Sequence, residues 1–165
     1  MARKVFFSFH FDGDFWRTQQ VRNIGAIEKD NPVSPSDWEA VKRGGDPAIK
    51  TWIANHLKGT SCTVVLIGTD TAKRPWVIYE IQESWKAGKG VVGIYINSLK
   101  DQSKKQSAKG ANPLDRITLT RNNAKLSTVA KAYDPSSLDS TVTYKWISDN
   151  LSAAVEEAIR IRTNY

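Results

Sequence analysis

The sequence predicts an α/β fold with a doubly wound parallel sheet, contained in a single domain, residues 1–165. Apolar runs that suit strands alternate along the chain with runs of helical periodicity, and this alternation indicates parallel strands joined by right-handed crossovers. Residues 62–67 include four consecutive apolar side chains, which is typical of a strand covered on both faces. The chain length suits one domain with a core of its own.

The first sixty residues predict two strands and three helices, each bounded by capping or turn residues. Asp14 is expected to cap the first helix, and a capping box that begins at Ser36 indicates the second. Asp46 at the cap and Pro47 at the first position begin the third helix. The predicted elements are a strand at 4–9, a short strand around Val33, and helices at 15–28, 36–43 and 46–58.

The rest of the chain predicts three further strands and two helices. Pro75 suits the first turn of a helix and Gly88 suits its end. The predicted elements are strands at 62–67 and 90–96, a weak edge strand at 126–133, helices at 75–87 and 141–162, and a polar loop at 98–112. In a flavodoxin-like strand order, a ligand binds between the carboxyl ends of strands one and three. This rule selects the turns at 8–14 and 68–74.

The helix at 75–87 has one face for a sheet and another for solvent or a ligand. The apolar face holds Val77, Ile78, Ile81 and Trp85. Trp76 and Glu80 lie one turn apart on the other side with Glu83, and Glu80 is nearest the boundary between the faces. Glu83 is the rival carboxylate, and we interpret it as solvated.

Composition and charge limit the classes of partner. A net charge of +7 suits an anionic partner, but nucleic acid is not expected because no zinc-finger spacing or RNA-binding signature occurs. No apolar run is long enough for a transmembrane helix, and the first residues do not match a signal peptide. The single cysteine, Cys62, lies in the most apolar strand and is interpreted as a core residue. Together these features favour the cytoplasm.

Common cofactor motifs are absent from both selected turns. Neither turn contains a Walker A or a dinucleotide fingerprint. The first turn is acidic and lacks the hydroxyl groups of an FMN phosphate loop, and we interpret Asp12 and Asp14 as turn and cap residues. His56 has no second ligand at metal spacing. We therefore expect neither a metal nor a bound cofactor.

Three motifs in the first hundred residues form a recognisable set. They are the first strand with its turn (KVFFSFHFDGD), a VVLIG strand before a polar turn, and the helix start RPWVIYEI. Shorter matches occur at 21–23, 37–42 and 93–97. Together these motifs resemble the TIR domain, and more narrowly the TIR-like ThsB family of the bacterial Thoeris anti-phage system. The resemblance is strongest over residues 1–98 and loose beyond 112. It implies a flavodoxin-like fold.

The family's Trp-Cys-x-x-Glu motif stands in this chain as Trp76 to Glu80, with Val77 in place of the cysteine. The resemblance implies an NAD nucleosidase and ADP-ribosyl cyclase with Glu80 as the catalytic residue and NAD as substrate. It also implies a cyclic ADP-ribose product that activates a partner effector. The chemistry suits one carboxylate, because positive charge develops on the ribose while nicotinamide leaves as a neutral molecule.

Further residues at strand ends and turns are candidates for contact with NAD. Aromatic walls would exclude water and hold the adenine folded back onto the ribose. Basic side chains would meet the diphosphate, and polar ones would bind ribose or amide groups. The aromatic candidates are Phe9, Phe11, Trp38 and Trp76, the basic candidates are His10, Lys73 and Arg74, and the polar candidates are Ser8 and Asn97.

Two other functions are open at this point. Many TIR domains only assemble with other TIR domains, so the chain could be a non-catalytic binding module. A nucleoside ribosyl-transfer enzyme could share this fold and glycosidic chemistry. Expected partners also include a phage-derived trigger and a second copy of the chain. A patch on the last helix, Val142, Trp146 and Ala153, is a candidate surface for self-association, although scattered surface apolar residues are ordinary. No role is assigned to residues 99–140.

Overall fold

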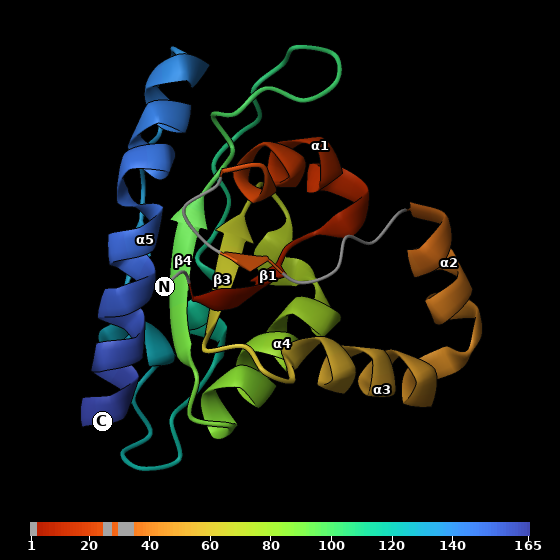
Figure 1. The fold of residues 1–165 in the computed structure, drawn as a ribbon, viewed down its shortest axis with the longest axis vertical. Coiled ribbons are helices and arrows are strands. Elements are labelled where there is room, and N and C mark those ends of the chain that lie inside the picture. The colour runs from red at the N-terminus through yellow and green to blue at the C-terminus, as the bar shows by residue number, and fades with distance from the viewer. Residues whose placement is uncertain (1–2, 25–27, 30–34) are drawn as a thin grey trace.

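A parallel sheet forms the centre of the fold (Figure 1). The computed structural model describes residues 3–24, 28–29 and 35–165. Within these residues the sheet has five strands in the order β2-β1-β3-β4-β5, and every neighbouring pair is parallel. The strands are β1 (Lys4–Ser8), β2 (Glu28–Lys29), β3 (Cys62–Ile67), β4 (Gly90–Tyr95) and β5 (Ala132–Tyr133). The direction of winding reverses between β1 and β3, which confirms the predicted flavodoxin-like order.

Helices cover both faces of this sheet. They are α1 (Phe11–Arg22), α2 (Pro35–Arg43), α3 (Gly45–Leu57), α4 (Pro75–Lys86) and α5 (Ser140–Asn164). One face of the sheet packs against α1 and α5, through side chains such as Val21 and Leu151. The other face packs against α3 and α4, through Ile53 and Ile81. Figure 1 shows α5 running beside β4, and the α2–α3 pair at the opposite side of the molecule.

The strand and helix at the middle of the chain lie where their patterns predict. β3 occupies the expected residues, and all six of its side chains are buried, as a strand covered on both faces requires. Pro75 is the first residue of α4, and Gly88 follows the helix with a φ of +78°. Cys62 is fully buried, and burial raises the pKa of its thiol to about 12, so it is a core side chain.

The predicted first helix is wrong at both ends. α1 begins at Phe11 and ends at Arg22 instead of spanning 15–28, and His10 is its N-cap residue. Asp14 therefore does not cap the helix. It lies at a kink inside α1, where its φ of −125° is not helical, and its side chain is buried beside Arg17. The expected strand around Val33 lies outside the described residues.

Two predictions for the second half of the chain also need correction. The expected edge strand at 126–133 is reduced to two residues, because Leu126–Thr128 form a 3₁₀ turn and only 132–133 pair with β4. Trp146 is not part of an exposed patch: it packs against the core and its ring lies 5.6 Å from that of Tyr133. Val142, by contrast, is 54% exposed. No helix in the described ranges has the length and apolar character needed to cross a bilayer.

Candidate active site

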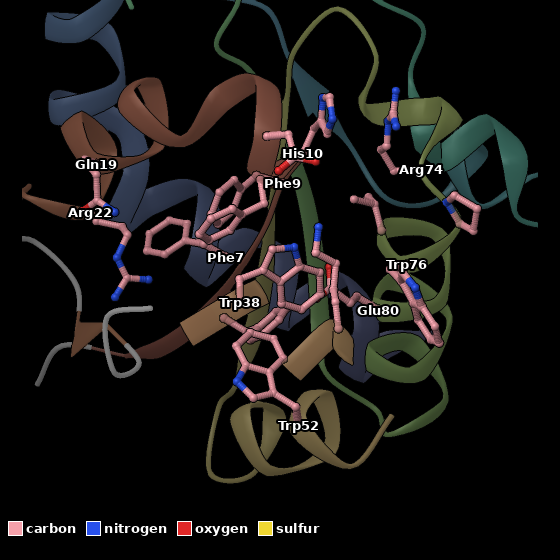
Figure 2. A pocket seen from close by; sticks show the side chains of 16 residues that line it. Phe7, Phe9, His10, Gln19, Arg22, Trp38, Trp52, Arg74, Trp76 and Glu80 are labelled. Carbon is pink, nitrogen blue, oxygen red and sulfur yellow. The ribbon is translucent and has the colours of Figure 1, made fainter. Parts of the chain in front are cut away.

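A pocket lies at the carboxyl end of β1, enclosed by the first turns of α1 and α4 and by α2 and α3 (Figure 2). Its lining comprises Phe6, Phe7, Phe9, His10, Phe11, Asp12, Gln19, Arg22, Trp38, Lys42, Trp52, Arg74, Pro75, Trp76, Val77 and Glu80. The turn after β1, one of the two turns that the switch-point rule selects, therefore forms part of the site.

The second selected turn contributes only its last residue, Arg74. The start of this turn is covered by the segment after β4. An added Cβ at Gly110 would lie 2.4 Å from the carbonyl oxygen of Gly68, so the two backbones are in direct contact. The Thr69 hydroxyl also donates a hydrogen bond to the carbonyl of Ala108. These contacts place residues 68–69 under the 108–110 segment, and the pocket lies to the α2–α3 side of them.

Glu80 is the carboxylate most deeply set in this pocket. It lies on α4, is only 7% exposed, and belongs to the lining. The Ser8 hydroxyl, at the end of β1, donates a hydrogen bond of 2.6 Å to its Oε1. Glu83, one turn later, lies outside the lining and forms an ion pair with Lys86. Of the two carboxylates on α4, only Glu80 lines the pocket.

Aromatic rings form a continuous wall of the pocket. Phe9 stacks on Phe11 at 5.5 Å between ring centroids, Phe11 lies 5.9 Å from Trp38, and Trp38 lies 5.4 Å from Trp52. These rings come from the β1–α1 turn, α2 and α3, so the wall joins segments far apart in the sequence. Figure 2 shows Phe7, Phe9 and Trp38 gathered between Glu80 and the Arg22–Gln19 end of the pocket. A planar heterocycle would find stacking partners along this wall.

The charged groups of the pocket carry both signs. The acidic groups are Asp12 and Glu80. The basic groups are Lys42, Arg74 before α4, and Arg22, whose guanidinium lies 5.8 Å from the Phe7 ring centroid. Burial lowers the pKa of His10 below its usual range, the charge of Arg74 lowers it further, and nearby aspartates oppose this shift. His10 is therefore expected to be neutral near pH 7, when it accepts or donates a hydrogen bond without carrying charge.

The pocket contains most of the residues predicted for the site. Those in the lining are Phe9, His10, Phe11, Trp38, Arg74, Trp76 and Glu80. Ser8 lies beneath Glu80 and is fully buried. Lys73 and Asn97 lie outside the lining. The Lys73 side chain is 73% exposed and pairs with Asp70, whereas Asn97 is buried and bonds to Ser136. Contacts of these three residues with a substrate remain predictions.

Several lining residues were not predicted from the sequence. Trp52 lies among the apolar residues of α3, and its ring joins the aromatic wall. Arg22 lies within the short match at 21–23 to the TIR-like family, and this match could have indicated it as a site residue. The remaining unpredicted members are Phe6, Phe7, Asp12, Gln19, Lys42, Pro75 and Val77. In the part of the chain that the structure describes, no three His, Cys, Asp or Glu side chains group as metal ligands would.

A buried carboxylate beside stacked rings and basic side chains is an arrangement suited to a cationic sugar transition state. The carboxylate faces developing positive charge, the rings hold planar bases, and the basic groups attract a negatively charged substrate. The geometry offers electrostatic stabilisation by a carboxylate that is itself only 7% exposed.

Comparisons with known proteins bear on the same region. The family model described as "Thoeris protein ThsB, TIR-like domain" matches residues 6–101, more than half of the chain. The chain is also similar to a protein of Bacillus cereus (strain MSX-D12) that carries the name "Putative cyclic ADP-D-ribose synthase ThsB1". The two are 41% identical over 123 residues, which cover 71% of this chain and 64% of that protein. The match thus spans less than two thirds of the relative's length.

Proposed function

The chain belongs to the ThsB family of TIR-like Thoeris proteins, and on this premise we propose that it is an NAD-consuming enzyme of anti-phage immunity. It cleaves the bond between nicotinamide and ribose and forms a cyclic ADP-ribose-type signal that activates a partner effector. The name of the Bacillus cereus relative supports a cyclic product. NAD is the substrate, and the reaction needs no further cofactor.

The observation that carries this proposal is the position of Glu80. Its carboxylate is nearly buried, lines the pocket and lies among aromatic and basic side chains. When the bond between nicotinamide and the ribose C1 breaks, both bonding electrons leave with nicotinamide, which becomes neutral. The ribose acquires oxocarbenium character, and the charge of Glu80 stabilises it. A nucleophilic group of the adenosine half then captures C1 and releases a proton, or water does so and yields the linear product.

Other pocket residues support binding rather than bond cleavage. Phe9, Phe11, Trp38 and Trp76 provide surfaces for nicotinamide and adenine, and exclusion of water by these rings favours cyclisation over hydrolysis. Arg74 and His10 both line the pocket and would meet the diphosphate. An enzyme that signals on infection would act in the cytoplasm, under control of a phage-derived trigger or of self-assembly.

The test is incubation with NAD, followed by chromatography and mass spectrometry of nicotinamide and nucleotide products. Purified protein alone, protein with lysate of phage-infected cells, and cells under infection are compared. Glu80→Gln is expected to lose at least ~10²–10³-fold in the rate of nicotinamide release. Glu83→Gln is the matched control, because Glu83 lies on the same helix but outside the pocket lining. Unchanged release by Glu80→Gln would refute the proposal.

Two other outcomes identify the alternative functions. If no condition yields nicotinamide but the chain assembles with itself or another TIR domain, it is a binding module. If nucleobases exchange on a nucleoside without use of NAD, it is a ribosyl-transfer enzyme. Glu80 would retain a role in the second case, because that reaction also builds positive charge on ribose.

A further inference from the structure

Ser8 is buried beneath Glu80, and its hydroxyl is bonded to the Glu80 carboxylate. It is the last residue of β1 and is fully buried. Its Oγ lies 2.6 Å from Glu80 Oε1, and because an ionised carboxylate only accepts hydrogen bonds, Ser8 is the donor. A hydroxyl donor within a dry interior forms a short, strong bond to a carboxylate.

The main chain of the same glutamate is held from the neighbouring strand. The Ser84 hydroxyl donates to the Glu80 carbonyl oxygen at 2.7 Å, one turn back along α4. Ser84 has a single hydroxyl hydrogen, so in its 2.6 Å contact with Thr63 it accepts, and Thr63 donates. Thr63 belongs to β3 and is fully buried, as is Ser84. Adjacent parallel strands, β1 and β3, thus hold Glu80 by its side chain and by its backbone.

We infer that Ser8 is a positioning residue that fixes the Glu80 carboxylate and favours its ionised form, while Thr63 and Ser84 fix the α4 main chain beneath it. The structural part of this inference stands on the hydrogen bonds alone. Its consequence for catalysis rests on the proposed function. Ser8 acts through Glu80 and not by binding ribose.

The physical reason is preorganisation. A carboxylate that stabilises a developing cation is most effective when it is charged and already oriented, because no reorganisation is then needed during the reaction. A hydrogen bond to the charged form of an acid favours that form. Removal of the Ser8 hydroxyl should therefore make Glu80 easier to protonate and less well oriented. The other charged or titratable groups of the pocket lining are His10, Asp12, Arg22, Lys42 and Arg74, and the variants below leave them unchanged.

The first test reads the ionisation of Glu80 directly and does not require activity. Protein labelled with ¹³C-glutamate gives six carboxyl resonances, one for each glutamate in the sequence. The Glu80 resonance is the one that Glu80→Gln removes. Its pH midpoint is expected to rise by about one unit in Ser8→Ala, the size of shift that loss of one charge-assisted bond gives. Ser8→Thr, which keeps a hydroxyl, should restore the wild-type midpoint.

A matched control separates this effect from the general loss of a buried hydroxyl. Thr143 on α5 is also fully buried, and its hydroxyl donates to the Pro135 carbonyl, far from the pocket. Thr143→Val should leave the Glu80 midpoint unchanged. If Ser8→Ala does not fold, Ser8→Cys keeps nearly the same volume with a much weaker donor and should give a smaller rise. A wild-type midpoint in Ser8→Ala, or in Ser8→Cys if the alanine variant does not fold, would overturn the inference.

The second test uses nicotinamide release under the conditions that activate the wild type. Ser8→Ala should lower kcat about tenfold or more with little change in KM, and it should move the acidic limb of the pH–rate profile upward. A rise in KM with unchanged kcat would instead show that Ser8 contacts the substrate. If the wild type releases no nicotinamide, the proposed function fails, and the carboxyl titration still decides the role of Ser8.

Discussion

The Asp14 carboxylate and the Arg17 guanidinium form an ion pair of 3.0 Å in the interior, with both side chains at most 5% exposed. The same guanidinium donates to the main-chain carbonyls of Leu99 and Lys105, at 2.8 and 3.0 Å. Arg17 therefore attaches α1 to the segment that follows β4. Because this ion pair is sealed from solvent, neither charge can recover its hydration if the partner is lost.

Arg17→Met is expected to destabilise the protein by about 3–5 kcal/mol, because it leaves the Asp14 carboxylate buried without its cation. Burial already raises the pKa of Asp14, and loss of Arg17 would raise it further. A folded-state pKa above the unfolded value gives stability at low pH that is lost as pH rises. The destabilisation should therefore be larger at pH 8 than at pH 5, as measured by urea unfolding.

The control for this variant is Lys145→Met, which breaks the exposed pair of Lys145 and Asp149 on α5. Exposed pairs contribute little, so no measurable change is expected. Equal stability of Arg17→Met and wild type would show that the buried pair does not hold α1 in place.

Most of the fold could be predicted because its elements follow local signals. The continuous apolar run predicts β3, and the proline predicts the start of α4. Both signals lie within a few adjacent residues of the sequence. The start of α1 could not be predicted, because Asp14 has the properties of a capping residue. It lies inside the helix instead, paired with Arg17 three residues later, and tertiary packing holds Arg17 in place through the Leu99 and Lys105 carbonyls. The edge strand β5 is short because Leu126–Thr128 form a 3₁₀ turn, so only residues 132–133 pair with β4.

The site could be predicted in part, on the strength of one motif. The Trp76–Glu80 spacing and the switch-point rule selected the end of β1 at which the pocket lies. They could not show that the 108–110 segment covers the second turn, because that contact joins residues some forty positions apart. The place of Trp52 in the pocket lining could not be predicted either. An aromatic residue on the apolar face of a helix does not indicate which side chains it will contact. Ser8 was predicted to contact ribose or an amide group, and the structure shows its hydroxyl bonded to Glu80 instead of lining the pocket.

His10 should titrate below pH 6.5, the usual value for histidine. Its pKa is lowered by burial first and by the charge of Arg74 second. Arg74→Gln is therefore expected to raise the midpoint of the His10 imidazole resonance, measured by proton NMR. Asp12→Asn should lower it, because Asp12 opposes the shift. Because the folded protein binds this proton more weakly than the unfolded chain, the stability contribution is complete above about pH 6.5 and is lost on acidification.

Lys73→Gln is the matched control for Arg74→Gln. Lys73 is the preceding residue in the chain, but its side chain points to solvent and pairs with Asp70. The His10 midpoint should not move in this variant. His56→Gln assigns the resonances, since the sequence has two histidines. A His10 midpoint above 6.5, or one insensitive to Arg74, would contradict the electrostatic description of the pocket.

The β4 and α5 backbones approach each other closely at Gly90, and replacement of this glycine should separate them. A Cβ added at Gly90 would lie 2.7 Å from the main-chain carbon of Ala158, which cannot move without shifting the helix. Gly90→Ala is therefore expected to destabilise the protein by about 1–3 kcal/mol, and to speed amide hydrogen exchange along α5. Gly88→Ala is the control: its new Cβ meets nothing within 4 Å, but its φ of +78° strains alanine. It should lose stability without faster exchange in α5. If Gly90→Ala leaves α5 exchange unchanged, the close contact does not hold this helix on the sheet.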